Sequence, residues 1–292
     1  MGLNTHLCSH EELPAWAKDN AFIVTGYRRP ELFRHDTIAK CWASIWLYAH
    51  NESAHLLDHL GSLPSFLLPL AHARIFFPSS SSLNRTPTPS DWLDIAGFTT
   101  FLLAAVTCLT LSSTFHTLSC HSRQLAKRCN ALDYVGIVVM IVGSFLPALH
   151  YGFHEHPKWQ LFYGLGIVSL GGVAAWAVLT PHYATPEYRP VRTAIFLALG
   201  LSAVVPVAHG YILYDYATLR LTMGLDWLIL SGSLYVVGAL TYACRGPERF
   251  APGRFDYVGA SHQLFHCAIV GAAFAHYVCL RRAWAYWHGV GV

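Results

Sequence analysis

Five polar residues of this chain combine side-chain types and spacings that can support chemistry at a metal ion. His262 and His266 are four residues apart, so on a helix their imidazoles share one face. Ser112 and His116 repeat this spacing in an earlier segment, and Asp133 follows after a short polar stretch. Two imidazoles on adjacent helical turns can reach one metal ion. A third imidazole at the same depth would complete a set of three nitrogen ligands.

The composition indicates that the elements carrying these residues are embedded in a membrane. Hydrophobic residues make up 54% of the 292 residues and charged residues 12%, about half the charged share of a soluble domain. Mean hydropathy is +0.37. The net charge of +3 is small and no run of Lys or Arg stands out, which excludes nucleic acid as a partner. We therefore predict an integral, multi-pass protein of the plasma membrane or an endomembrane, with the lipid bilayer as a partner.

Hydropathy predicts six membrane spans and a weaker seventh. A bilayer core about 30 Å thick needs about 20 mostly apolar residues in a helix. The weaker candidate runs from about His55 to Phe77 and contains Asp58, His59 and Arg74. The six stronger stretches are roughly Asp94 to Leu118, Leu132 to Phe153, Leu161 to Leu179, Thr193 to Tyr214, Leu225 to Tyr242 and Tyr257 to Leu280.

The distribution of positive charge favours seven spans with the N-terminus in the cytosol. In that orientation 13 of the 19 Lys and Arg residues lie on the cytosolic side and 6 on the other side. The predicted fold is therefore an all-α bundle of seven transmembrane helices with an intramembrane metal site. We divide the chain into a cytosolic N-terminal region (1–53), a seven-helix transmembrane region (54–282) and a short extracytosolic tail (283–292).

This topology brings the chemically capable residues to one end of the bundle. The end of the second span, the start of the third and the start of the seventh all lie on the cytosolic side. His116, His262 and His266 then lie at similar depth, with Asp133 and Ser112 beside them. Three histidines with a fourth position open to water are the pattern of a catalytic zinc site. Bound zinc lowers the pKa of water towards neutrality, and a neighbouring carboxylate can take or orient its proton.

Structural roles for the same residues stay open at this point. A single intramembrane histidine can pack helices by bonding to a backbone carbonyl. Ser112 can bond to the carbonyl four residues before it, and Asp133 can be an interfacial helix cap. His55 and His59 share a face of the weak first span, and they either line the interior or sit at the interface. The role of these two, and of His209 deep in the fifth span, is not fixed by the sequence.

Several ordered motifs resemble the PAQR family, which includes the progestin and adipoQ receptors, the adiponectin receptors and the hemolysin III-like proteins. The resemblance covers most of the chain. The matching segments are Gly26-Tyr27-Arg28-Arg29-Pro30, His50-Asn51-Glu52-Ser53, Phe115-His116-Thr117, Cys120-His121-Ser122, Leu132-Asp133-Tyr134-Val135-Gly136-Ile137, Pro247-Glu248-Arg249-Phe250 and Ser261-His262-Gln263-Leu264-Phe265-His266.

The resemblance implies Zn²⁺ bound by His116, His262 and His266, with Asp133 and Ser112 beside the metal-bound water. All five positions match the family pattern. It also implies seven helices with the N-terminus inside. Fungal members are associated with lipid, sterol and zinc homeostasis, and the animal adiponectin receptors with ceramide hydrolysis. Nothing in this sequence selects among these associations.

Three functions compete at this stage. The first is a zinc-dependent hydrolase that cleaves a membrane lipid amide such as ceramide, with Asp133 as general base and Ser112 holding the oxyanion or water. The second is a seven-helix receptor in which zinc is structural and a small sterol-like molecule binds. The third, a transporter, ranks last, because the fourth and sixth spans carry almost no ionisable residues to line a pore.

Overall fold

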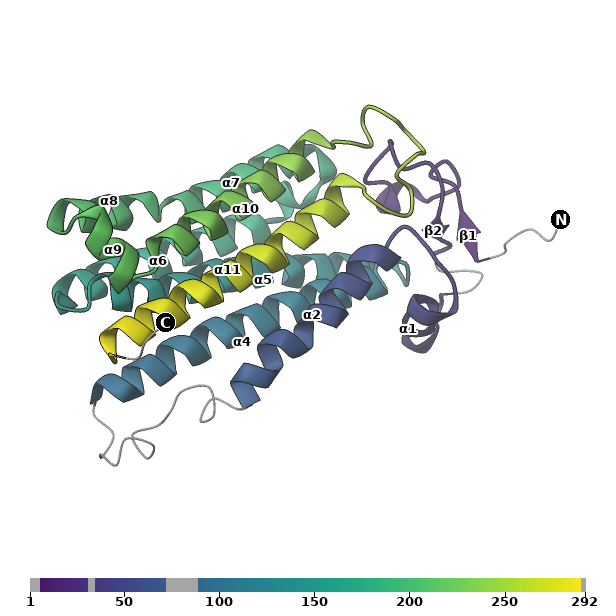
Figure 1. Cartoon of the computed structure of the whole chain (residues 1–292). Coiled ribbons are helices and arrows are strands. Elements are labelled where there is room, and N and C mark those ends of the chain that lie inside the picture. Colours follow the sequence, from purple (N-terminus) through teal and green to yellow (C-terminus); the bar gives the residue numbers. More distant parts are fainter. Residues whose placement is uncertain (1–5, 31–34, 72–88, 290–292) are drawn as a thin grey trace.

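The chain folds into a long bundle of helices, and residues 6–30 form a small N-terminal cap at one end of it (Figure 1). The computed structural model describes residues 6–30, 35–71 and 89–289. Strands β1 (Leu7–Cys8) and β2 (Tyr27–Arg28) pair antiparallel within the cap. The helices are α1 (Ile38–Leu47), α2 (Ser53–Ala71), α4 (Pro89–Leu118), α5 (Arg123–Gly152), α6 (Pro157–Leu179), α7 (Arg189–Leu201), α8 (Val204–Leu213), α9 (Tyr216–Thr222), α10 (Leu225–Cys244) and α11 (Ser261–Trp287). Short 3-10 turns η1 (Ala15–Ala17), η2 (Pro181–Ala184) and η3 (Pro186–Tyr188) join some of them.

Helix boundaries follow from capping residues in the sequence. Thr37, Ser122 and Asp215 each accept a hydrogen bond from a backbone N–H in the first turn of α1, α5 and α9. Pro157 occupies the first turn of α6, where a missing N–H costs nothing. Because Pro206 cannot donate to the carbonyl four residues earlier, the predicted fifth span is interrupted between α7 and α8.

Six helical segments of the described residues are long and apolar enough to cross a membrane. They are α4 from Trp92, α5, α6, the α7–α8 pair, α10 and α11. The prediction of an integral multi-pass membrane protein is confirmed. Helix α2 has 19 residues with Pro64 and Pro69 inside it and is not among the six, so the seventh span stays a prediction. The end of that predicted span, residues 72–77, lies outside the described residues.

The bundle carries its large apolar side chains outward as well as inward, as a lipid-facing protein must. Trp176 of α6 is 73% exposed and Ile212 of α8 is 81% exposed. Helix α4 packs against α5, α10 packs against α11, and α2 lies against both α4 and α11. Gly143 allows the α4–α5 contact, because a Cβ at this position would lie 2.4 Å from Cβ of Ala104.

The N-terminal cap is tied to the same end of the bundle that carries His116 and His262. Buried Arg28 donates to the carbonyl oxygens of His116 and Thr117 at the end of α4. Asp256 of the α10–α11 loop accepts from the backbone N–H groups of Val24 and Thr25 at 2.9 and 2.8 Å. These contacts hold together three segments far apart in the sequence.

Most helix starts differ from the hydropathy prediction by four or more residues, and those of α5 and α11 bear on the metal centre. Helix α5 begins at Arg123, nine residues before Leu132, because Ser122 caps a polar first turn that hydropathy does not count. Helix α11 begins at Ser261, four residues after Tyr257, and continues to Trp287. Asp133 is therefore in the interior of α5, and the interpretation of Asp133 as a helix cap is wrong.

Candidate metal centre

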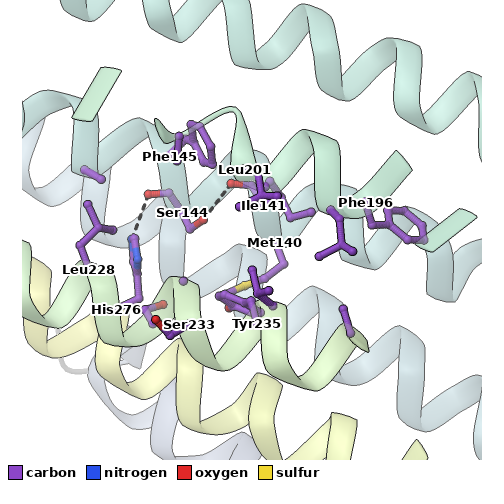
Figure 2. Close-up of a pocket in the computed structure, with 18 of the residues that line it drawn as sticks. Met140, Ile141, Ser144, Phe145, Phe196, Leu201, Leu228, Ser233, Tyr235 and His276 are labelled. Atoms are coloured by element: carbon purple, nitrogen blue, oxygen red, sulfur yellow. Dashed lines mark hydrogen bonds between the residues drawn. The ribbon is translucent and has the colours of Figure 1, made fainter. Parts of the chain in front are cut away.

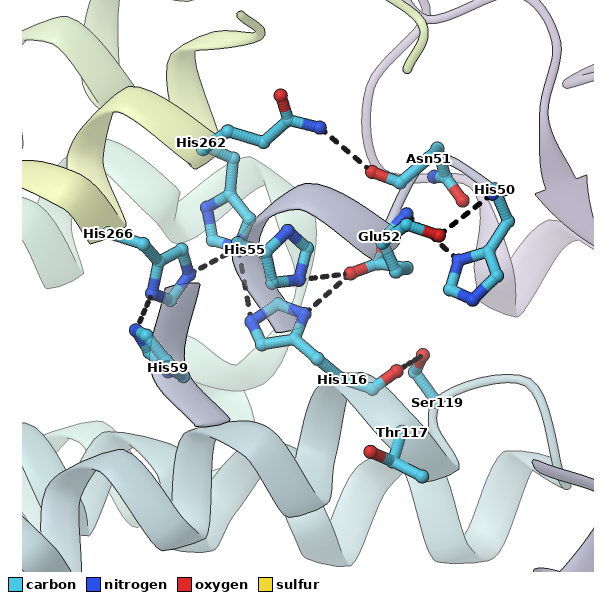
Figure 3. Close-up of polar contacts among 12 residues, drawn as sticks. His50, Asn51, Glu52, His55, His59, His116, Thr117, Ser119, His262 and His266 are labelled. Carbon is cyan, nitrogen blue, oxygen red and sulfur yellow. Dashed lines mark hydrogen bonds and ion pairs between the residues drawn. The ribbon is translucent and has the colours of Figure 1, made fainter. Parts of the chain in front are cut away.

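Three histidines from two helices point their Nε2 atoms towards one another at the capped end of the bundle (Figure 3). His116 lies in the last turn of α4, and His262 and His266 lie in the first two turns of α11. Nε2 of His262 is 3.3 Å from Nε2 of His116 and 3.1 Å from Nε2 of His266. His116 and His266 are each only 3% exposed. The structure thus brings together the three residues that the sequence predicts as ligands.

The donor set and its geometry fit a zinc ion. Tetrahedral zinc with Zn–N bonds of 2.0–2.1 Å places its nitrogen ligands about 3.4 Å apart, close to the two separations observed. Without a cation, the central Nε2 of His262 would face two other ring nitrogens, and a neutral imidazole carries only one N–H. A cation at the shared point satisfies all three lone pairs.

Asp133 and Ser112 reach the same region from α5 and α4. Both side chains are buried, and both line one large cavity together with His262 and His266. Ser112 Oγ makes no hydrogen bond to a carbonyl of its own helix. The interpretation of Ser112 as a residue bonded to its own helix carbonyl is therefore wrong, and its hydroxyl faces the cavity beside the carboxyl of Asp133.

The cavity extends from the histidines into the apolar middle of the bundle. Its volume is about 1060 Å³, and most of its lining comes from α5, α7, α8, α10 and α11. Figure 2 shows part of the wall, where Met140, Phe145 and Phe196 present apolar surface. Its few polar groups include His276, whose ring is 3.0 Å from the carbonyl oxygen of Ser144. The space suits an apolar chain that enters beside the metal centre.

Three polar residues at the start of α2, namely Glu52 just before the helix and His55 and His59 within it, have roles that the sequence analysis left open or did not assign (Figure 3). Glu52 Oε2 lies 2.7 Å from His116 Nδ1 and 2.5 Å from His55 Nε2. His59 Nε2 lies 2.7 Å from His266 Nδ1. Positions 52, 55 and 59 have the spacing of one helix face. This spacing is the feature of the sequence from which a polar face towards the metal centre could have been inferred.

His209 belongs to a different part of the molecule. Its Nδ1 lies 2.9 Å from the hydroxyl of Tyr163, and its ring meets Trp159 edge-on at 4.5 Å between centroids. It therefore packs α8 against α6 and takes no part in the metal centre.

Comparison with known proteins decides the family. The profile of haemolysin-III-related proteins matches residues 47–277, most of the chain and all of the residues described above as the centre. The chain belongs to the haemolysin-III-related family. The resemblance to adiponectin receptors and other PAQR proteins is thereby confirmed.

Relatives of this haemolysin-III-related protein occur in animals, fungi and plants. It is 37% identical to the adiponectin receptor protein of Drosophila melanogaster over 93% of its own length and 58% of that protein's. It is 36% identical to an ADIPOR-like receptor of Saccharomyces cerevisiae over 92% and 81% of the two lengths. For heptahelical transmembrane protein 3 of Arabidopsis thaliana, the identity is 34% over 93% and 86%. The chain thus spans little more than half of the fly relative.

Proposed function

We propose that this haemolysin-III-related protein is a zinc-dependent hydrolase that cleaves the amide bond of a membrane lipid of the ceramide type. The observation that carries the proposal is the convergence of three Nε2 atoms beside a carboxyl and a hydroxyl at the wall of a large apolar cavity. Each of these groups can take part in amide hydrolysis. The apolar cavity beside them can hold a substrate that stays in the bilayer.

In the proposal, His116, His262 and His266 hold the metal through Nε2. A zinc ion bound there would supply Lewis-acid activation of water and of the substrate carbonyl. The carboxylate of Asp133 takes the proton of the attacking water and passes it to the amide nitrogen as the C–N bond breaks. Ser112 Oγ donates a hydrogen bond to the carbonyl oxygen as negative charge develops there. The products are a fatty acid and an amine.

The shape of the cavity supports a lipid substrate. Apolar side chains of α5, α7 and α10 line most of it, so it offers an acyl chain the same surroundings as the bilayer. Ser112, Asp133, His262 and His266 lie at one end of the cavity, while Ser144 and His276 lie further along its wall. An amide between a long chain and a polar head would place its carbonyl at that end while the chain fills the rest.

The test combines metal content with lipid turnover in proteoliposomes. Purified protein is expected to contain about one zinc per chain, and the His262→Ala/His266→Ala double variant none. Asp133→Asn is expected to keep the metal and lose the release of fatty acid from ceramide, because only the proton acceptor is gone. His209→Ala, which lies outside the centre, is the control for expression and insertion. Full turnover by Asp133→Asn would refute the mechanism.

A second candidate is a receptor in which zinc is structural and a small lipid or sterol-like molecule occupies the cavity. The names of the fly and yeast relatives, an adiponectin receptor and an ADIPOR-like receptor, favour this alternative. It predicts that chelation lowers the thermal stability while no lipid is cleaved under any metal load. Fatty acid released by wild-type protein and not by Asp133→Asn would reject it.

The proposal includes α2 as a seventh span with the N-terminus in the cytosol. The length of α2 and its packing against α4 and α11 support a transmembrane position, as does the name of the heptahelical plant relative. The charge bias supports the orientation. A protease-sensitive tag placed before residue 6 is expected to be protected in sealed right-side-out vesicles and cleaved in inverted ones.

A further inference from the structure

Glu52, the residue before α2, and His59 of α2 contact the outward-facing nitrogens of two predicted metal ligands. Glu52 contacts His116, and His59 contacts His266, each on the Nδ1 side of the ring. The Nε2 side of both rings faces the metal centre. The following inference rests on the proposed function, since it concerns residues that act on the ligands of that same zinc site.

The contact with Glu52 determines which nitrogen of His116 carries hydrogen. An ionised carboxylate accepts hydrogen bonds and cannot donate them. Nδ1 of His116, 2.7 Å from Glu52 Oε2, must therefore be the N–H. In the neutral ring this leaves the lone pair on Nε2, which is the atom that faces His262 at 3.3 Å. A carboxylate, a histidine and a metal in this order both orient the ring and raise its basicity.

His59 fixes the position of the hydrogen on His266 in the same way, but with a neutral imidazole in place of a carboxylate. If His266 Nε2 gives its lone pair to a metal, its Nδ1 must donate, and the acceptor 2.7 Å away is Nε2 of His59. His59 is 2% exposed, and it also lines the cavity. Its own Nδ1 then carries hydrogen and has no partner among the described residues. His59 thus fixes the tautomer of His266, and its own N–H lies on the side of its ring opposite to His266.

His55 completes the arrangement around Glu52. Its Nε2 lies 2.5 Å from the same carboxylate oxygen that accepts from His116. The His55 ring is 4.0 Å from that of His116, edge-on, and stacks on that of His266 at 5.0 Å. The carboxylate is therefore held between two imidazoles, and its negative charge lies one ring away from the position of the cation.

We propose that Glu52 and His59 are positioning residues that hold His116 and His266 in the tautomers that bind zinc through Nε2. Glu52, His55 and His116 are also close enough to one another to form a second cation site. That arrangement would require the ring of His116 to give up hydrogen from both nitrogens, since its Nε2 already faces the first site. The hydrogen-bonded arrangement needs no such step.

The first experiment measures zinc affinity by competition with a chelator in the purified full-length protein. Glu52→Gln keeps the size and an acceptor oxygen but removes the charge, and it is expected to weaken zinc binding about 10- to 100-fold. Asp58→Asn makes the same chemical change six residues later, within α2, and the Asp58 carboxylate makes no hydrogen bond to a ligand ring in the described part of the chain. It is the matched control and is expected to stay within about twofold of wild type.

The second experiment uses the visible spectrum of the cobalt-substituted protein, which reports ligand geometry without any turnover. In His59→Gln the side-chain amide oxygen can accept from His266 Nδ1 where the ring nitrogen did, so the four-coordinate spectrum is expected to persist. His59→Leu removes the acceptor at similar volume. It is expected to change the spectrum and to weaken cobalt binding by about tenfold or more.

The outcomes separate this inference from the proposed function. Zinc bound by wild type with equal affinity in Glu52→Gln and Asp58→Asn would refute the positioning role and leave the zinc site standing. Two zinc ions per chain, falling to one in Glu52→Gln, would make Glu52 a ligand and would also refute it. A folded wild-type protein that binds no zinc would overturn both proposals. Loss of affinity in Glu52→Gln with unchanged stability of the metal-free protein supports the inference.

Discussion

Arg28 and Arg29 are adjacent arginines in opposite environments, and this pair allows a sharp test of how the cap stabilises the metal centre. Arg28 is 3% exposed and donates to the carbonyl oxygens of His116 and Thr117 in the last turn of α4. Arg29 makes a surface ion pair with Glu12, with both side chains more than a third exposed. Replacing each by Ala therefore removes the same charge with different consequences.

The expected cost of Arg28→Ala follows from the two carbonyls it leaves behind. A hydrogen bond from a charged donor contributes about 1.5–3 kcal/mol, so the two together contribute about 3–6 kcal/mol. The hydroxyl of Ser119, 3.2 Å from the oxygen of His116, replaces part of this. We therefore expect Arg28→Ala to lower the free energy of unfolding by about 3 kcal/mol. Arg29→Ala should lower it by at most about 1 kcal/mol, as for exposed ion pairs.

The assay is unfolding of the purified protein in mixed micelles, with zinc affinity as a second readout. Arg28 holds the backbone of a ligand residue, so Arg28→Ala is expected to weaken zinc binding as well as stability. Arg29→Ala should change neither. Equal stability losses in the two variants, or full zinc affinity in a strongly destabilised Arg28→Ala, would refute the reasoning that the cap positions His116.

Three further predictions concern packing, pH and metal. Gly143→Leu is expected to cost about 2 kcal/mol or more, because its side chain would meet Ala104 of α4, while Gly166→Leu, with open space around it, should leave unfolding in micelles unchanged. Desolvation by neighbouring groups opposes ionisation of Asp19, but Arg245 and Arg189 hold its pKa below the ordinary value although its side chain is 58% exposed. Wild type should thus exceed Asp19→Asn in free energy of unfolding by a constant amount above a pH of about 4, and this difference should shrink as the pH falls further. Chelation should lower the thermal midpoint of wild type by an amount that zinc restores.

Each of these has an outcome that would contradict it. Equal stability of both leucine variants would mean that α4 and α5 do not approach as closely as the Cβ distance requires. A gap between wild type and Asp19→Asn that grows towards acid pH would reverse the sign of the linkage. A response to chelator in the His262→Ala/His266→Ala variant equal to that of wild type would place the stabilising metal elsewhere.

The metal-centre histidines could be found from the sequence because two local rules fix them. The four-residue spacing of His262 and His266 survives in any helix, and hydropathy placed the end of α4 at the depth of the start of α11. The helix-cap interpretation of Asp133 was wrong because hydropathy counts only the apolar part of α5. The polar first turn after Ser122 belongs to the helix but not to the apolar stretch that hydropathy detects.

The partners of these histidines could not be found in the same way. Whether Glu52 meets His116 depends on how α2 crosses α4, which is decided by packing between segments 64 residues apart. The sequence offered only the one-face spacing of Glu52, His55 and His59, which fits an interior or an interfacial face equally well. Likewise, the buried role of Arg28 differs from that of Arg29 only because of tertiary contacts.

The cap also has a consequence for how the protein is made. Asn20 donates to the carboxylate of Glu248, 228 residues later, and Glu248 in turn accepts from the backbone and side chain of Ser261. At a synthesis rate of about 5–20 residues per second, roughly ten to fifty seconds separate the appearance of the two partners on the ribosome. Asn20 must wait through that interval without its carboxylate partner, whereas Arg28 can pair earlier with the end of α4. Closure of the cap around Asn20 is therefore a late event in biogenesis, and a nascent chain arrested before Glu248 should present residues 20–25 to protease.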